Sequence, residues 1–203
     1  MPEKYSFRCS EQECSNRVCC TREHVNVTIS DLSRWTTQGY LENIIYGLTL
    51  VTDDTVSIET MRKPLSKDPQ KTVCIFYVED SNACSIRYSR PISCRTFPLN
   101  YNGEKFYVSD KACPGIGKGE VTREALKELR DLAEQEYRER TETASSLPPI
   151  YTVVMAHVLR RSAEAMRSLS EEDRKKVEEI LSRGKATTNE EPGHASASDE
   201  RPM

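Results

Sequence analysis

The residues best suited to chemistry are eight cysteines, all within the first 113 residues of a 203-residue chain. Thiolates are soft ligands that select zinc or iron–sulfur clusters over magnesium or calcium. Four plus four thiolates is the number that two tetrahedral ions or two clusters require. The pattern therefore predicts metal ligation by two runs of cysteines, which are Cys9, Cys14, Cys19 and Cys20, then Cys74, Cys84, Cys94 and Cys113.

The spacing of the cysteines leaves the number of metal centres open. Neighbouring residues of an extended chain point in opposite directions. The adjacent Cys19 and Cys20 are therefore expected to serve two different sites, or one of them is not a ligand. A single four-cysteine cluster with spare thiols is the alternative that the spacing leaves open.

Six arginines lie within a few residues of a cysteine. Guanidinium groups there can offset the negative charge of thiolates and shift a reduction potential through hydrogen bonds to sulfur. The alternative for each is an ordinary solvated arginine. Arg90 and Arg95 are the strongest candidates for contact with a cluster, among the six that are Arg8, Arg17, Arg22, Arg87, Arg90 and Arg95.

The remaining motifs give weaker indications of function. His24 follows the double cysteine and is interpreted as an exposed loop residue. The run 115–119 lacks the first glycine and the hydroxyl residue of a phosphate-binding loop, so it is interpreted as a tight turn beside Cys113. No serine–histidine–aspartate set or pair of carboxylates is evident, and the sequence assigns no catalytic residue.

Composition limits the class of protein. The chain is 36% hydrophobic and 30% charged, with a net charge of -3, as expected of a soluble globular protein and not of a strongly basic nucleic-acid binder. The start of the chain has no apolar leader, and the apolar stretch 150–159 is shorter than the roughly 20 residues of a membrane span. We therefore expect a cytoplasmic protein without membrane contact, in which reduced cysteines bind metal.

The elements that must position the cysteines are short. Strands are expected over 72–78, 84–88 and 105–108, with a hairpin turn at Asn102-Gly103. A helix is expected from Ser30 or Asp31 through Trp35, followed by a second short one over 41–45. This predicts an α+β fold, a small metal-stapled domain with short strands.

Beyond residue 120 the pattern becomes helical. One helix is expected after Thr122 as the N-cap, a second is expected to open at Pro148-Pro149, and a third follows Ser170. We expect these helices to pack on the domain or on a protein partner. From Gly184 onward the composition predicts disorder. The expected division is a cysteine-cluster domain over 1–120, a helical extension over 121–183 and a tail over 184–203.

Four segments resemble a known family: residues 7–20, residues 84–86, the run Arg90-Pro91-Ile92-Ser93-Cys94-Arg95-Thr96-Phe97-Pro98, and residues 113–117. They are similar to the CxxCxxCC family, also called YkgJ-type, whose members are described as candidate zinc- or iron-chelating proteins. The family usually separates its first cysteines by two residues, whereas this chain has four between Cys9 and Cys14. The resemblance covers roughly residues 7–119 and implies a metal-binding domain.

Three hypotheses follow. The first is an iron–sulfur protein, with a 4Fe–4S cluster and a redox or electron-transfer role. The second is a structural zinc module whose saturated thiolate sites leave no open position for catalysis. The third is a chelator or carrier that passes metal to others. The sequence does not choose between iron–sulfur and zinc.

Overall fold

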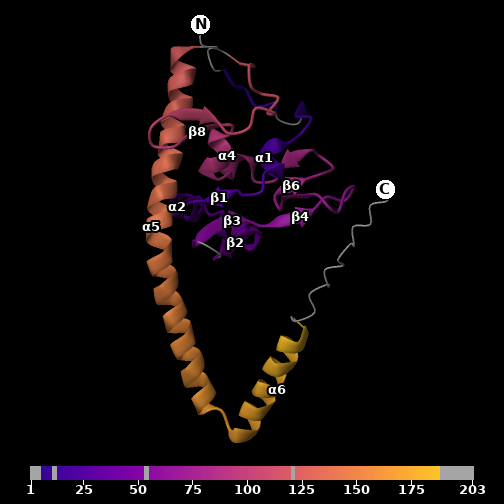
Figure 1. Cartoon of the computed structure of the whole chain (residues 1–203), viewed down its shortest axis with the longest axis vertical. Coiled ribbons are helices and arrows are strands. Elements are labelled where there is room, and N and C mark those ends of the chain that lie inside the picture. Colours follow the sequence, from indigo (N-terminus) through magenta and orange to yellow (C-terminus); the bar gives the residue numbers. More distant parts are fainter. Residues whose placement is uncertain (1–5, 11–12, 53–54, 120–121, 188–203) are drawn as a thin grey trace, which may run out of the picture. The chain divides into compact units, whose positions relative to one another are not determined.

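The computed structural model describes residues 6–10, 13–52, 55–119 and 122–187, with the side chains of the last helix described through Ile180. Small antiparallel sheets occupy the cysteine-rich region, and long helices follow it (Figure 1). The expected α+β class is confirmed. The chain divides into two compact units between Tyr151 and Thr152.

The largest sheet in the described chain has three antiparallel strands in the order β1-β3-β2. Ile58 in the central strand pairs with Val27 on one side and with Leu50 on the other. Sequence analysis predicted none of these strands, because each is too short for a clear alternation of apolar and polar residues. Their bounds are Asn26–Val27 for β1, Leu48–Val51 for β2 and Ser57–Thr60 for β3.

Three hairpins carry or flank the later cysteines. They are β4 (Arg62–Pro64) with β5 (Thr72–Cys74), β6 (Tyr77–Val78) with β7 (Ala83–Cys84), and β8 (Leu99–Tyr101) with β9 (Phe106–Val108). The strand expected over 72–78 is therefore two strands. The one expected over 84–88 gives way after Cys84 to the 3₁₀ turn η3 (Arg87–Ser89). The hairpin at Asn102-Gly103 is confirmed, and Gly103 has the positive φ of 98° that such turns favour.

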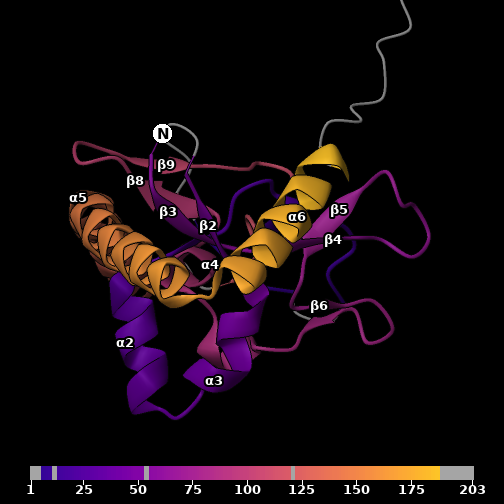
Figure 2. The ribbon, with the colours of Figure 1, turned by 90° about the horizontal axis from the view of Figure 1, so that it is seen from below.

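Two helices and a turn build an apolar core against the three-stranded sheet. They are α2 (Ile29–Thr37), α3 (Leu41–Ile44) and the 3₁₀ turn η2 (Ile45–Gly47), with α2 and α3 in contact (Figure 2). The expected helix starts earlier than predicted, because Thr28 is its N-cap and accepts a hydrogen bond from Asp31 N–H at 3.0 Å. The core consists of Val27, Trp35, Ile44, Ile58 and Leu147.

The helix α5 (Arg123–Ser168) is continuous through Pro148 and Pro149, so the expectation that these prolines open a new helix is wrong. Each proline removes a backbone donor and crowds the carbonyl four residues earlier, so other contacts must hold the helix here. Burial of Thr143 and Leu147 within the first unit fixes the helix just before that point. Thr122 accepts from Ala125 N–H at 3.1 Å, which confirms the predicted N-cap.

The second unit comprises the end of α5 and the helix α6 (Glu171–Thr187), whose Ser170 cap accepts from Asp173 N–H at 3.2 Å. No side chain described in this unit is buried. The helix continues past Gly184, and residues 188–203 of the expected tail lie outside the described residues. None of the described helices combines the length and the apolar character that crossing a bilayer requires.

Candidate metal centre

The double cysteine lies on a helical turn, α1 (Val18–Thr21). The sulfur atoms of Cys19 and Cys20 are 3.9 Å apart. The assumption of an extended chain, with the two side chains pointing in opposite directions, is therefore wrong. Arg17 caps this turn in the left-handed conformation, with φ of 45°. This turn brings two thiols together at a single place.

Arg62 holds the turn from a distant strand. Its guanidinium donates to the carbonyl oxygens of Cys20 at 3.1 Å, Thr21 at 3.1 Å and Arg22 at 2.7 Å. It also donates to Thr72 O at 2.6 Å, which ties the turn to β5. Carbonyl groups at the end of a helix lack partners inside the helix, and a cationic donor there is favourable. Arg62 thus fixes the double cysteine beside the strand that ends in Cys74.

Cys94 lies in a second helical turn, α4 (Ile92–Thr96), which begins after Pro91. Arg22 Nη2 donates to Cys94 Sγ at 3.1 Å, and Nη1 donates to Ser93 O at 3.2 Å. The same guanidinium lies 5.3 Å from the centre of the Phe97 ring. A cation is therefore held against the sulfur of Cys94.

Cys9 and Cys113 come together although they are far apart in sequence. Phe7 forms an isolated antiparallel bridge with Ile116, and Arg8 N–H donates to Gly115 O at 3.1 Å. A Cβ at Gly115 would lie 2.5 Å from Arg8 O, so this approach requires glycine. The expected tight turn beside Cys113 is thus also a docking point for the N-terminal cysteine segment.

Asn82 ties Cys14 into the same region. It lies in the turn between β6 and β7 with a positive φ of 46°, and its amide donates to Cys14 O at 3.1 Å. Its side-chain oxygen accepts from Arg17 Nε at 2.7 Å. The turn between β6 and β7 thus links Cys14, Arg17 and the strand that carries Cys84.

All eight cysteines line two small cavities, which we call the thiol chamber. The first cavity, of about 60 Å³, is lined by Cys9, Cys14, Cys19, Cys94 and Cys113. The second, of about 40 Å³, is lined by Cys9, Cys19, Cys20, Cys74, Cys84 and Cys94. The two runs of the sequence are therefore mixed in space. Cys113 lies with the first run, and Cys20 lies with Cys74 and Cys84.

The ionisation of the thiols is uneven. A hydrogen bond from Cys20 and the positive charges of Arg22, Arg17 and Arg90 lower the pKa of Cys19 to about 6. That hydrogen bond and burial raise the pKa of Cys20. Burial raises the pKa of Cys84 to about 11 and also raises the pKa values of Cys94 and Cys113. The Cys19 thiolate therefore forms readily, whereas a bound cation favours loss of the proton from the thiols whose pKa is raised.

The donor set fits a thiophilic metal in type, number and enclosure. Arg17, buried in the wall of both cavities, has an Nη2 group without a hydrogen-bond partner among the described residues. Such a buried cation matches the excess negative charge of metal thiolates. In the described parts of the chain, no three cysteine, histidine or acidic side chains already form a ligand set. The sulfurs must therefore draw together on binding, and the ligand role of each cysteine stays a prediction.

Both arginines singled out in the sequence line the thiol chamber, and their contact with a cluster stays a prediction. Arg90 lines both cavities, whereas the exposed Arg95 lines only the first. Arg17 and Arg22, which flank the double cysteine, make the closer contacts described above. Their position beside Cys19-Cys20 was the available sequence signal. No sequence signal pointed to Arg62, because the carbonyl groups that it binds lie about 40 residues earlier in the chain.

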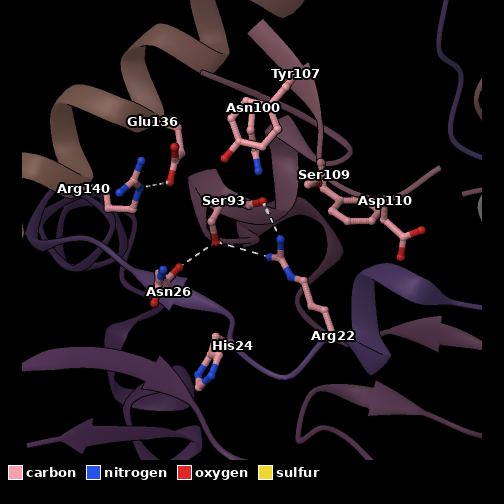
Figure 3. Close-up of a pocket in the computed structure, with 11 residues that line it drawn as sticks. Arg22, His24, Asn26, Ser93, Asn100, Tyr107, Ser109, Asp110, Glu136 and Arg140 are labelled. Carbon is pink, nitrogen blue, oxygen red and sulfur yellow. Dashed lines mark hydrogen bonds and ion pairs between the residues drawn. The ribbon is translucent and has the colours of Figure 1, made fainter. Parts of the chain in front are cut away.

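His24 lies outside the thiol chamber, as expected of an exposed loop residue. Its Nδ1 lies 3.1 Å from a carboxylate oxygen of Glu59, and this contact raises the pKa of His24. The imidazole instead lines a separate polar pocket, together with Arg22 and Ser93 (Figure 3). No histidine lines the two cavities of the thiol chamber in the described residues.

Fold and site together define a cysteine-cluster, metal-binding α+β protein. The sequence model of the CxxCxxCC family, described as "Putative zinc- or iron-chelating domain", matches residues 8–114. Because the match spans more than half of the chain, the protein belongs to this family, as the resemblance implied. Neither a curated protein nor a solved structure matches the chain.

Proposed function

We propose that the chain is an iron–sulfur protein that transfers electrons, with the cysteines of the thiol chamber as ligands. When bound, an iron–sulfur cluster supplies a one-electron redox centre. The observation that supports this proposal best is the presence of arginine side chains next to the cysteine sulfurs. Arg22 donates to Cys94 Sγ at 3.1 Å, and Arg17 is buried in both cavity walls. Hydrogen bonds to sulfur and nearby positive charge stabilise the more negative, reduced state.

The direct test is anaerobic purification followed by metal and sulfide analysis. We expect a brown protein with broad visible absorption that bleaches on reduction, and iron and acid-labile sulfide in equal amounts. Cys94→Ser should lose most of the iron. The protein is then incubated anaerobically with iron and sulfide. A protein that stays colourless and contains neither iron nor sulfide after this reconstitution contradicts the proposal.

A second test addresses the arginines. Arg22→Gln removes the N–H···S bond and a positive charge, so the reduction potential should fall by on the order of 60 mV. Arg95→Gln is the matched control, because Arg95 is exposed and lines only the first cavity. Equal shifts in both variants would mean that general charge, and not the contact with Cys94, sets the potential.

A structural zinc site is the second candidate, and the double cysteine favours it. Two sulfurs bound to one tetrahedral zinc at about 2.3 Å lie about 3.8 Å apart. The observed separation of Cys19 Sγ and Cys20 Sγ is 3.9 Å. In this case the purified protein is colourless and redox-inert, and it contains one or two zinc ions per chain. Metal analysis therefore separates the two candidates in a single preparation.

We also propose a reducing compartment for the protein, in keeping with a thiol-based metal site. All eight cysteines are free thiols, which is the form that ligation requires. Mass spectrometry after rapid alkylation of intact cells tests this, with reduced cysteines as the expected result. Four stable disulfides would contradict both this location and the metal function.

A further inference from the structure

A polar pocket outside the thiol chamber has the size of a small-molecule site. Its volume is about 380 Å³, and it lies between α4, the hairpin β8–β9 and α5 (Figure 3). Ligand pockets in proteins commonly start at about 300 Å³. Polar side chains from four separate segments meet here. Of these, only Arg22 and its partner Ser93 also take part in the contacts of the thiol chamber described above.

An ion pair on α5 forms one charged part of the wall. Glu136, only 6% exposed, accepts a hydrogen bond from Arg140 Nε at 3.0 Å. Burial raises the pKa of Glu136, which weakens the negative charge at this wall. The two Nη groups of Arg140 hold no hydrogen bond with any described residue, so they keep their donor capacity. The pair therefore positions a guanidinium that has donors left for a ligand.

The neutral part of the wall adds further donors. The side-chain amide of Asn100 and the phenol of Tyr107 hold no hydrogen bond among the described residues, and both face the pocket (Figure 3). Asp110, the other acid in the lining, already accepts from Ala112 N–H at 2.7 Å. Arg140, Asn100 and Tyr107 thus present donor groups that no described residue uses, and such donors suit an oxygen-rich anion.

We propose that this pocket binds a small polar molecule carrying an oxyanion, either a carboxylate or a phosphate, with Arg140 as its anchor. Asn100 and Tyr107 donate to its remaining oxygens. The Arg22 side chain connects this site to the thiol chamber, because it lines the pocket and also donates to Cys94 Sγ. The inference itself rests on the pocket and holds whichever metal the chamber binds.

Calorimetric titration of the full-length, metal-loaded protein tests the site with three probes of similar size. Glycerol phosphate carries the phosphate, glycerate carries the carboxylate, and glycerol carries neither. We expect saturable binding of at least one of the two anions and none of glycerol. Which anion binds more tightly identifies the source of the oxyanion.

Two arginine variants on the same helix locate the binding. Arg140→Gln should weaken anion binding by about tenfold or more, since it removes the charged donors. Arg138→Gln is the matched control, because Arg138 is exposed on α5 and does not line the pocket. Circular dichroism confirms that both variants are folded.

Three results would overturn the proposal. They are the absence of saturable anion binding to the wild-type protein, binding of glycerol as tight as that of the anions, and equal weakening by Arg140→Gln and Arg138→Gln. The metal content is measured in the same samples. A protein that binds anions but holds no iron would therefore refute the iron–sulfur proposal while leaving this one intact.

Discussion

The thiol chamber and the apolar core are held together by different forces. In the core, Trp35 is fully buried and its indole N–H donates to Ser89 O at 2.6 Å. Helix α2 adds a capping box, and Leu147 of α5 covers the cluster. These contacts bury apolar area and satisfy polar groups without any other component.

The chamber has little of this support. Five of its cysteines lie on turns of four or five residues and on strands of two or three, and Cys9, Cys14 and Cys113 lie outside any helix or strand. Single side chains such as Arg62 and Asn82 connect these pieces by hydrogen bonds to backbone oxygens. Short pieces of this kind bury too little apolar area to offset the entropy of ordering them. The comparison indicates that the core orders itself, whereas the chamber depends on metal.

Metal removal is the change expected to separate the two regions most. Binding of structural zinc contributes about 10–16 kcal/mol to the folding of small zinc domains. Chelation under reducing, anaerobic conditions should therefore increase amide hydrogen exchange in α1 and β4–β7 strongly. Trp35 is the only tryptophan, so its fluorescence reports on the core alone. Its emission should remain that of a buried indole.

Full reconstitution of the metal provides the control and should restore the slow exchange. A shift of Trp35 emission to that of a solvated indole on chelation would break the comparison. It would mean that both regions unfold as one cooperative unit.

Trp35→Ala tests the same comparison by weakening the apolar core instead of the thiol chamber. Truncating a fully buried aromatic residue typically costs about 3–5 kcal/mol. We expect a loss of this size in urea unfolding of the metal-loaded protein, with the metal content unchanged. Trp35→Phe keeps most of the packing but removes the bond to Ser89 O, so it should cost less. Loss of metal in Trp35→Ala would show that the core holds the chamber in place.

Sequence patterns predicted the parts of the fold that follow local rules. Thr122 and Ser170 as caps and Asn102-Gly103 as a hairpin turn were found because each signal lies within four residues. The helix through Pro148-Pro149 was missed because the burial of Leu147 overrides a local breaker. The sheet β1-β3-β2 was missed because its pairing, and not its composition, defines it.

The candidate site was predictable in its residue types but not in its arrangement. Eight reduced cysteines indicate thiolate chemistry wherever they lie. That Cys113 joins Cys9 depends on the bridge between Phe7 and Ile116, which no local pattern encodes. The contact between Arg22 and Cys94 likewise joins residues 72 positions apart.

Asp31→Asn should have a smaller effect than Trp35→Ala. Asp31 is buried, and its carboxylate accepts from Ile92 N–H at 3.1 Å and from Thr28 N–H at 3.2 Å. Replacing one oxygen by an NH₂ group sets a donor against these donors, at a cost of about 2 kcal/mol. Urea unfolding measures the loss, with the exposed pair Asp68 and Lys71 as the control site. Asp68→Asn should change stability by less than about 0.5 kcal/mol, and an equal loss at both sites would contradict this role for Asp31.

Glu136→Gln should have the smallest effect, visible only in the dependence of stability on pH. Burial raises the pKa of Glu136 above its ordinary value of 4.5, so the stability this residue contributes is complete below that value. It is lost as the pH rises through the higher pKa of the folded state, because the buried group must then ionise. Glu136→Gln has no such ionisation.

Urea unfolding from pH 4 to pH 7 should therefore favour the wild-type protein most at the acid end and the variant progressively more above it. Glu142→Gln, an exposed position on the same helix, is the control and should follow the wild-type curve. Taking differences between variants at each pH removes the contribution of the cysteine ligands, which all three proteins share. Parallel curves for Glu136→Gln and the wild-type protein would mean that the ion pair with Arg140 fully offsets the burial of this carboxylate. The Glu136 carboxylate would then be as well compensated by its partners as the buried Asp31 is.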